Sequence, residues 1–113
     1  MNVLNRDRLN ELMELDEDGS GETLKLLAQM YLDTAVKKIS ELKTHHQLND
    51  EVHIRMAAHA LRSSSINLGV SLIAEISEKI EYGIIRSDTL AEHIHELDLG
   101  LEQVRIAFRE IKF

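Results

Sequence analysis

The sequence predicts an all-α domain, an antiparallel up-down four-helix bundle with a short N-terminal cap helix. Proline is absent, only five of the 113 residues are glycine, and aromatic residues make up 4% of the chain. Leucine, isoleucine, glutamate, lysine and alanine dominate instead, and most of these residues favour helices. Apolar residues also recur every three or four positions, which is the spacing of a helix that buries one side.

The N-terminal half of the chain predicts two helices of different length. A short amphipathic segment carries Leu9, Leu12 and Met13 at helical spacing. A longer helix is expected over residues 21–46, and the hydroxyl of Ser20 can cap its N-terminus. The apolar stripe of this second helix consists of Leu24, Ala28, Tyr31, Ala35, Ile39 and Leu42.

Two further helices are expected on either side of Gly69. Asn49 and Asp50 offer N-caps for the first of them, and Gly69 is a natural end because glycine adopts left-handed backbone angles easily. The stripe before Gly69 consists of Ile54, Ala57, Ala58, Leu61, Ser65 and Leu68. The stripe after it consists of Ile73, Ile76, Ile80 and Ile84.

The C-terminal segment gives the clearest periodic signal and predicts a helix over about residues 88–112. Thr89 and Glu92 are spaced as a capping box. The stripe consists of Leu90, Ile94, Leu97, Leu101, Val104, Phe108 and Ile111. Because the connections between the predicted helices are short, we expect antiparallel neighbours and one domain over residues 1–113.

Composition excludes several classes of protein. The net charge is −7 with scattered basic residues, whereas a nucleic-acid surface needs a basic patch, so no nucleic acid is expected as a partner. Cysteine is absent, which excludes disulfides and thiolate metal sites. The N-terminus lacks the pattern of a signal peptide, and no apolar run has the length of a membrane span. We therefore expect a cytoplasmic monomer that does not bind membranes.

One face of the third predicted helix differs from an ordinary solvated surface. Each helical residue turns by about 100°, so His59 lies opposite the apolar stripe and faces outward. The residues within about 60° of it are Val52, Arg55, Met56, Arg62, Ser63 and Ile66. Three apolar and two cationic side chains around one imidazole predict a docking patch with a reactive centre.

The chemistry expected at this patch is phosphoryl transfer. Imidazole is a neutral nucleophile near pH 7, and nearby positive charges favour its neutral form. Arg55 and Arg62 supply such charges, and the same guanidinium groups can stabilise phosphoryl oxygens. Ser63 is small enough to let a partner approach, and its hydroxyl can hydrogen-bond the second ring nitrogen.

The segment from His59 to Gly69, HALRSSSINLG, resembles the signature of histidine-phosphotransfer domains, which reads His-x-Leu-Lys-Gly-Ser-Ser/Ala, two variable residues, an apolar residue and Gly. It follows Ala57-Ala58 and precedes Glu78-Lys79-Ile80-Glu81, which is similar to the next helix of that family. Nearly the whole chain fits the family's layout.

The resemblance implies that His59 accepts a phosphoryl group from the aspartate of one receiver domain and passes it to another response regulator. The partners are then receiver domains and a hybrid sensor kinase, Mg²⁺ comes from the receiver, and the chain is a carrier without kinase activity. The sequence departs from the family twice, with Arg62 at the usual Lys and Ser63 at the usual Gly. Arg62 keeps the charge, whereas Ser63 adds a side chain that can slow transfer or select receivers.

Other functions remain as alternatives. One is a non-catalytic helical adaptor that binds receiver domains without relaying phosphate. A metal protein is disfavoured, because His45, His46, His53, His93 and His95 do not show the Glu-x-x-His pairing of di-metal bundles. A sensor kinase is disfavoured because glycine-rich nucleotide motifs are absent. The sequence is compatible with a free-standing carrier and with a piece of a larger hybrid kinase.

Overall fold

The computed structural model describes residues 2–111, and these residues form five helices and no strand. The helices are α1 (Arg6–Met13), α2 (Glu22–Gln47), α3 (Glu51–Leu68), α4 (Ser71–Tyr82) and α5 (Ser87–Glu110). The all-α class is therefore confirmed. None of these helices is both long and apolar enough to cross a membrane.

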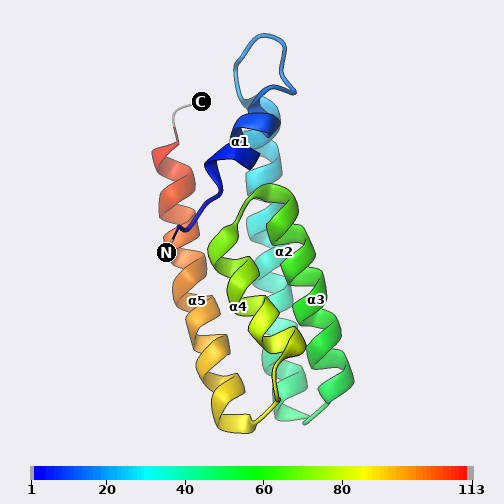
Figure 1. Cartoon of the computed structure of the whole chain (residues 1–113). Coiled ribbons are helices and arrows are strands. Elements are labelled where there is room, and N and C mark those ends of the chain that lie inside the picture. Colours follow the sequence, from blue (N-terminus) through cyan, green and yellow to red (C-terminus); the bar gives the residue numbers. More distant parts are fainter. Residues whose placement is uncertain (1, 112–113) are drawn as a thin grey trace.

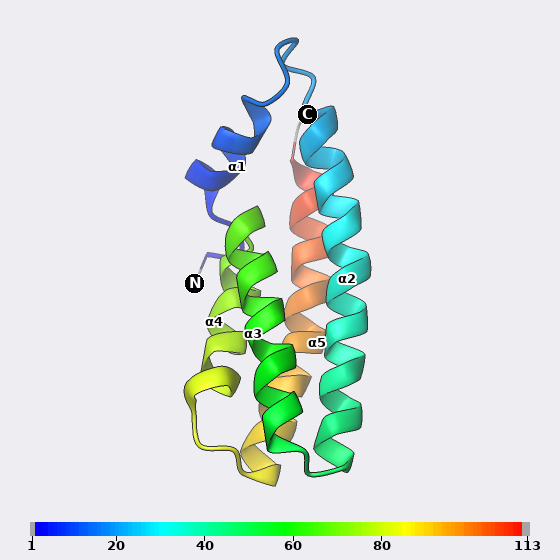
Figure 2. The same cartoon turned by 90° about the vertical axis from the view of Figure 1, so that its right-hand side faces the viewer.

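The four long helices form a closed up-down bundle (Figures 1 and 2). α2 packs against α3 and α5, and α4 packs against the same two helices from the opposite corner. Successive helices run in opposite directions, and the described chain measures 48 × 22 × 19 Å. α1 contacts α2 and α3 and lies across the end of the bundle where α3 turns into α4. The predicted bundle with its cap helix is confirmed.

The core lies along the axis of the bundle and is built from the predicted stripes. All members of the α2 and α3 stripes are buried, and so is the α5 stripe except Ile111, which is half-buried. Ile73, Ile76 and Ile80 of α4 are buried as well. Burial of such side chains is worth about 1.5–3 kcal/mol each, which explains why spacing alone located the helices.

The helix starts agree with the expected caps in part. Asp50 caps α3 by accepting a hydrogen bond from the backbone nitrogen of His53, as predicted. α2 begins one residue later than expected, after Gly21 in the left-handed conformation (φ +73°). Ser20 still accepts a hydrogen bond from the backbone of Glu22, so it contributes to the first turn.

Three expectations near the later helix ends are wrong or fall outside the description. α4 ends at Tyr82, and Ile84 is 84% exposed beyond it, because the chain leaves the bundle there. α5 begins at Ser87, so Thr89 lies inside the first turn and forms no capping box. Its backbone nitrogen bonds to the carboxylate of Asp88 instead. The expected C-terminal end near residue 112 lies outside the described residues.

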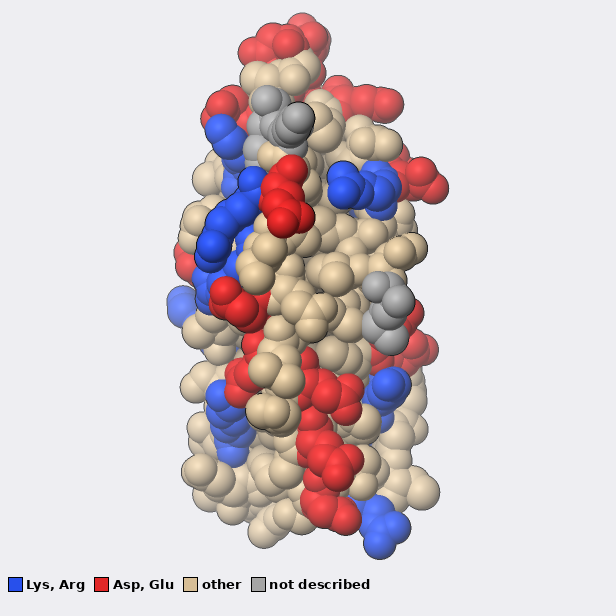
Figure 3. Space-filling model, turned by 90° about the vertical axis from the view of Figure 1, so that its left-hand side faces the viewer, with Lys and Arg blue, Asp and Glu red and all other residues tan. Residues whose placement is uncertain are grey.

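Charged residues are distributed over the surface in small groups. Figure 3 shows one long face on which Lys and Arg lie in separate places with Asp and Glu among them. Several charged residues form ion pairs within one helix, such as Lys38 with Glu41 at 3.1 Å. Lys43 joins two helices by pairing with Asp98 of α5 at 2.9 Å. Such exposed pairs contribute little to stability each.

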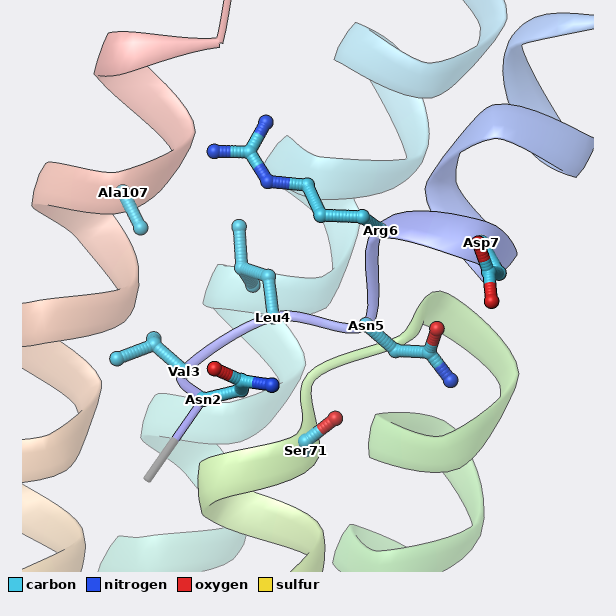
Figure 4. A pocket seen from close by; sticks show the side chains of 8 residues that line it. All are labelled: Asn2, Val3, Leu4, Asn5, Arg6, Asp7, Ser71 and Ala107. Atoms are coloured by element: carbon cyan, nitrogen blue, oxygen red, sulfur yellow. The ribbon is translucent and has the colours of Figure 1, made fainter.

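The N-terminal segment is attached to the α3–α4 turn through its backbone. The backbone nitrogen of Asn5 donates to the carbonyl of Gly69 at 2.7 Å, and that of Leu72 donates to Val3 at 3.2 Å. Arg8 donates to the carbonyl of Asn67 at 2.8 Å. Figure 4 shows the hollow beside this segment, with Leu4 between the bundle helices. These bonds hold α1 across the end of the bundle.

Candidate functional site

His59 lies at the middle of α3 and faces outward, as predicted. Its side chain is 58% exposed. The apolar residues predicted around it are exposed too, with Val52 at 66%, Met56 at 60% and Ile66 at 51%. α3 therefore presents an imidazole among three solvent-accessible apolar side chains on the face opposite its buried stripe.

The ring of His59 is held by a carboxylate from the next helix. Nδ1 lies 2.5 Å from Oε2 of Glu81, which is in the last turn of α4. Only 10% of the Glu81 side chain is exposed. Desolvation raises the pKa of this carboxyl, but hydrogen bonds from Arg62 and His59 outweigh it and hold the pKa below its usual value.

An ionised carboxylate only accepts hydrogen bonds, and this fixes the roles of the two ring nitrogens. Nδ1 of His59 must carry the hydrogen in its bond to Glu81. In the neutral ring, Nε2 then keeps its lone pair. No hydrogen bond to Nε2 is present within residues 2–111, so this atom is available to a reactant from solvent.

Arg62 reaches across to α4 and is paired with the same carboxylate. Its Nε donates to Oε1 of Glu81 at 2.6 Å, and its Nη2 donates to the hydroxyl of Tyr82 at 3.1 Å. The guanidinium also lies 5.3 Å from the centre of the Tyr82 ring. The bond to Glu81 raises the pKa of Arg62. The sequence predicts that the positive charge of Arg62 stabilises phosphoryl oxygens, and in the structure this charge is already paired with Glu81.

Arg55 is also tied to the end of α4. Its Nη1 donates to the backbone carbonyl of Glu81 at 2.6 Å, and its Nη2 pairs with Glu51 at 3.0 Å. The carbonyls in the last turn of a helix lack intrahelical partners, so this bond caps α4. A shallow hollow results, and it is lined by Arg55, Met56, His59, Glu81 and Tyr82.

The serines after His59 follow the sequence prediction in part. Ser64 and Ser65 face the bundle and donate to the carbonyl of Leu61 at 3.1 and 2.6 Å, as expected. Tyr31 bonds to Ser65 at 2.7 Å and completes this buried pair. The expected bond from Ser63 to the ring is wrong, because Glu81 occupies Nδ1 and the half-buried Ser63 makes no side-chain hydrogen bond within residues 2–111.

Glu81 and Tyr82 are the site residues that sequence reasoning missed. In the sequence analysis Glu81 appears only within the segment Glu78–Glu81, and no role at the site is assigned to it. A usable signal existed, since Glu78 and Glu81 lie near the end of a helix whose isoleucine stripe is buried and whose other side faces solvent. No three His, Cys, Asp or Glu side chains gather as metal ligands in the part of the chain that the structure describes.

A model of a known protein family matches most of the chain. The model of the Hpt domain family matches residues 26–107. The multistep phosphorelay regulator 1 of Schizosaccharomyces pombe is 27% identical over 86 residues, which are 75% of this chain and 29% of that protein. The chain thus spans less than a third of the length of this relative.

A solved structure shows the same fold. The crystal structure of histidine-containing phosphotransfer protein B from Pseudomonas aeruginosa PAO1 matches with a TM-score of 0.83 and 24% identity. The match covers 96% of this chain and 92% of that one.

Proposed function

Because the chain belongs to the Hpt domain family, we propose that it carries a phosphoryl group on His59 between the receiver domains of response regulators. Family membership supports a role in histidine phosphotransfer within a phosphorelay, with response regulators as partners. The finer proposal assigns the carrier atom to Nε2 of His59. It also assigns the upstream donor to the receiver domain of a hybrid sensor kinase.

The observation that carries the proposal is the exposed imidazole in its surroundings. Nε2 makes no hydrogen bond within residues 2–111, and on the same face of α3 the exposed Val52, Met56 and Ile66 form an apolar rim that a partner can cover. Covering that rim excludes water from the reacting atoms, which strengthens electrostatic interactions and limits hydrolysis. The geometry therefore fits transfer between two docked proteins.

In this proposal the chain supplies the attacking nitrogen of His59 and the side chains around it. Nε2 attacks the phosphorus of the aspartyl phosphate, while Ser63 limits how closely the partner approaches. Arg55 lines the hollow and Arg62 pairs with Glu81 in its wall, so both add positive charge near the incoming phosphoryl oxygens. In this proposal Mg²⁺ is a ligand of the partner receiver, and this chain acts as a monomeric carrier in the cytoplasm without kinase activity.

The direct test is transfer from a phosphorylated receiver domain in the presence of Mg²⁺. We expect an adduct on this chain that is labile to acid and stable to base, as a phosphorus–nitrogen bond to histidine is. His59→Gln should abolish the adduct. His53→Gln is the matched control, because His53 is an exposed histidine of the same helix with its own carboxylate partner, Asp50, at 2.6 Å. It should leave labelling unchanged.

The alternative of a non-catalytic adaptor gives a different result in the same experiment. An adaptor binds receiver domains and stays unlabelled, whatever receiver is offered. Tight binding without an adduct across all receivers of the source cell would therefore contradict the relay function.

A further inference from the structure

We propose that Tyr82 is a phosphoryl-binding residue, whose hydroxyl donates a hydrogen bond to an oxygen of the phosphoryl group on His59. The inference rests on the proposed function and deepens it by naming a further group that contacts the phosphoryl oxygens. It starts from the position of Tyr82 at the end of α4, where this residue is 66% exposed and lines the same hollow as His59.

The backbone on both sides of Tyr82 is held in place. Before it, Nη1 of Arg55 donates to the carbonyl of Glu81 at 2.6 Å. After it, the backbone nitrogen of Gly83 donates to the carbonyl of Lys79 at 3.0 Å. A Cβ added at Gly83 would collide with that carbonyl, so the chain leaves the helix at a residue without a side chain. Tyr82 is therefore fixed at the edge of the hollow although its side chain is largely exposed.

The hydroxyl of Tyr82 has a hydrogen that no acceptor binds. Nη2 of Arg62 donates to the hydroxyl oxygen at 3.1 Å, and because a guanidinium has no acceptor, the hydroxyl only accepts in this bond. A tyrosine hydroxyl can donate one hydrogen bond besides those that it accepts. Within residues 2–111, no side chain or carbonyl takes this hydrogen. A phosphoryl oxygen in the hollow can therefore serve as its acceptor.

Arg62 also restricts where that hydrogen points. The guanidinium presents only hydrogens to the oxygen, so the hydroxyl hydrogen must turn away from Arg62. The guanidinium carbon lies 5.3 Å from the centre of the Tyr82 ring, and Nε of Arg62 is bound to Glu81 at 2.6 Å. The donor is thus oriented before a phosphoryl group arrives, and a preorganised donor needs no reorganisation during the transfer.

A neutral donor is useful at this hollow because the positive charges there are already paired. Arg55 pairs with Glu51 at 3.0 Å, and Arg62 pairs with Glu81 at 2.6 Å. A phosphoryl group brings negative charge to this wall, and its oxygens are strong acceptors that need donors. The Tyr82 hydroxyl is a donor in the wall of the hollow that no carboxylate occupies.

Labelling by phosphoramidate tests the inference without any partner protein. With this small phosphorus–nitrogen donor, Nε2 of His59 bonds to phosphorus, and ammonia leaves with the electron pair of the broken phosphorus–nitrogen bond. Tyr82→Phe keeps the ring and removes the hydroxyl. We expect its labelling rate to be about tenfold lower than that of the wild type, which is the size of effect that loss of one hydrogen bond to a charged group produces.

Tyr31→Phe is the matched control. It removes the hydroxyl of the other tyrosine in the chain, which is buried in the bundle and bonds to Ser65 at 2.7 Å. Ser65 keeps its own bond to the carbonyl of Leu61 at 2.6 Å. Tyr31→Phe should be labelled at the wild-type rate. Equal losses in the two variants would contradict a specific contact with Tyr82.

NMR of the tyrosine rings gives a second readout. The chemical shift of Cζ, the ring carbon that carries the hydroxyl, changes when the hydroxyl donates a new hydrogen bond. In protein with ¹³C-labelled tyrosine, we expect Cζ of Tyr82 to shift when His59 is phosphorylated, while Cζ of Tyr31 stays in place. An unchanged Cζ of Tyr82 would overturn the inference.

A double variant separates a direct contact from an effect through Arg62. In Arg62→Met, the Tyr82 hydroxyl loses the group that donates to it and can still donate its own hydrogen. If this hydroxyl contacts the phosphoryl group, adding Tyr82→Phe to Arg62→Met lowers the labelling rate further. No further loss would show that Tyr82 acts only by holding Arg62, and the inference would fail.

Transfer from a receiver domain distinguishes the inference from the proposed function. Because the proposed contact is with the phosphoryl group, Tyr82→Phe should slow labelling by a receiver and by phosphoramidate to a similar extent. Slower labelling by the receiver alone would make Tyr82 a docking residue, which overturns the inference and leaves the proposed function intact. If phosphoramidate labels the wild type and no receiver does, the proposed function fails, and the comparison with phosphoramidate still decides on Tyr82. A wild-type chain that neither donor labels contradicts both.

Discussion

The imidazole of His59 on α3 and the carboxylate of Glu81 on α4 are joined through Nδ1 and Oε2, 22 residues apart in sequence. The side chain of His59 is 58% exposed and that of Glu81 is 10% exposed, so neighbouring side chains cover Glu81 while His59 stays accessible. Nδ1 of His59 therefore faces the protein, whereas Nε2 makes no hydrogen bond within residues 2–111.

The Glu81 contacts predict a specific pH dependence of stability. The pKa of this carboxyl is lower in the folded chain than its usual value of 4.5. A group of this kind stabilises the fold above its unfolded pKa, and the contribution is lost as pH falls through the folded pKa. We expect Glu81→Gln to lower Tm at pH 7, with a difference from wild type that shrinks below about pH 4.5.

Thermal unfolding of both proteins between pH 3 and pH 7 measures this difference. Glu78→Gln controls for the change of net charge, because Glu78 is exposed. A difference between Glu81→Gln and wild type that grows as the solution becomes more acidic would have the wrong sign for a carboxyl stabilised by Arg62 and His59.

The apolar rim predicts that docking and chemistry can be separated. Met56→Glu places a charge in the centre of the rim, where a partner must exclude water. We expect Kd for a receiver domain to rise about tenfold or more, which corresponds to about 1.4 kcal/mol or more. Labelling by phosphoramidate should fall much less, because a small donor does not need the rim.

Leu99→Glu is the matched control for Met56→Glu. Leu99 is 55% exposed on α5, whose neighbours in the bundle are α2 and α4. Calorimetric titration with one receiver domain compares the two variants. Equal losses of affinity would show that added negative charge, rather than the site of docking, weakens binding.

We expect the side chain of Ser63 to hinder phosphoryl transfer between proteins sterically. Its half-buried side chain lies one turn after His59 and makes no hydrogen bond to the ring. Ser63→Gly should therefore speed transfer from a receiver domain or widen the range of receivers, although glycine costs the helix about 0.5–1 kcal/mol. Labelling rates with phosphoramidate supply the comparison, and an equal gain with this small donor would exclude the steric explanation.

A substitution at Gly69 tests how firmly the N-terminal segment is attached to the α3–α4 turn. It has φ +78°, and an added Cβ would lie 3.1 Å from both the carbonyl oxygen of Asn5 and Cβ of Arg8. Gly69→Ala should be destabilised by the left-handed backbone, about 1–2 kcal/mol, and by this crowding in addition. Gly19→Ala isolates the backbone cost, because Gly19 has φ +68° with nothing within 4 Å of an added Cβ.

Urea denaturation of the two glycine variants gives the comparison. We expect the free energy of unfolding to fall further for Gly69→Ala than for Gly19→Ala. Equal losses would mean that α1 moves aside without cost and that its backbone bonds to the α3–α4 turn are weak.

The sequence by itself determined the helices, their buried sides and the outward direction of His59. These properties are local, because each residue turns the helix by about 100° and a repeated apolar stripe must be buried. For the same reason the exposure of Val52, Met56 and Ile66 could be predicted before any packing was known. Helix ends were less certain, as Ile84 and Thr89 show, because a cap depends on where the chain turns.

Only the tertiary structure decided what His59 touches. The distance from Nδ1 of His59 to Glu81 depends on how α4 is rotated about its axis and on how far α4 is shifted along α3. The spacing of the isoleucines in α4 determines neither of these. Arg62 has the right charge for a phosphate, but its position was decided by a carboxylate and a tyrosine hydroxyl on another helix. Such contacts arise from packing between segments far apart in sequence, and a periodic pattern within one segment carries no information about them.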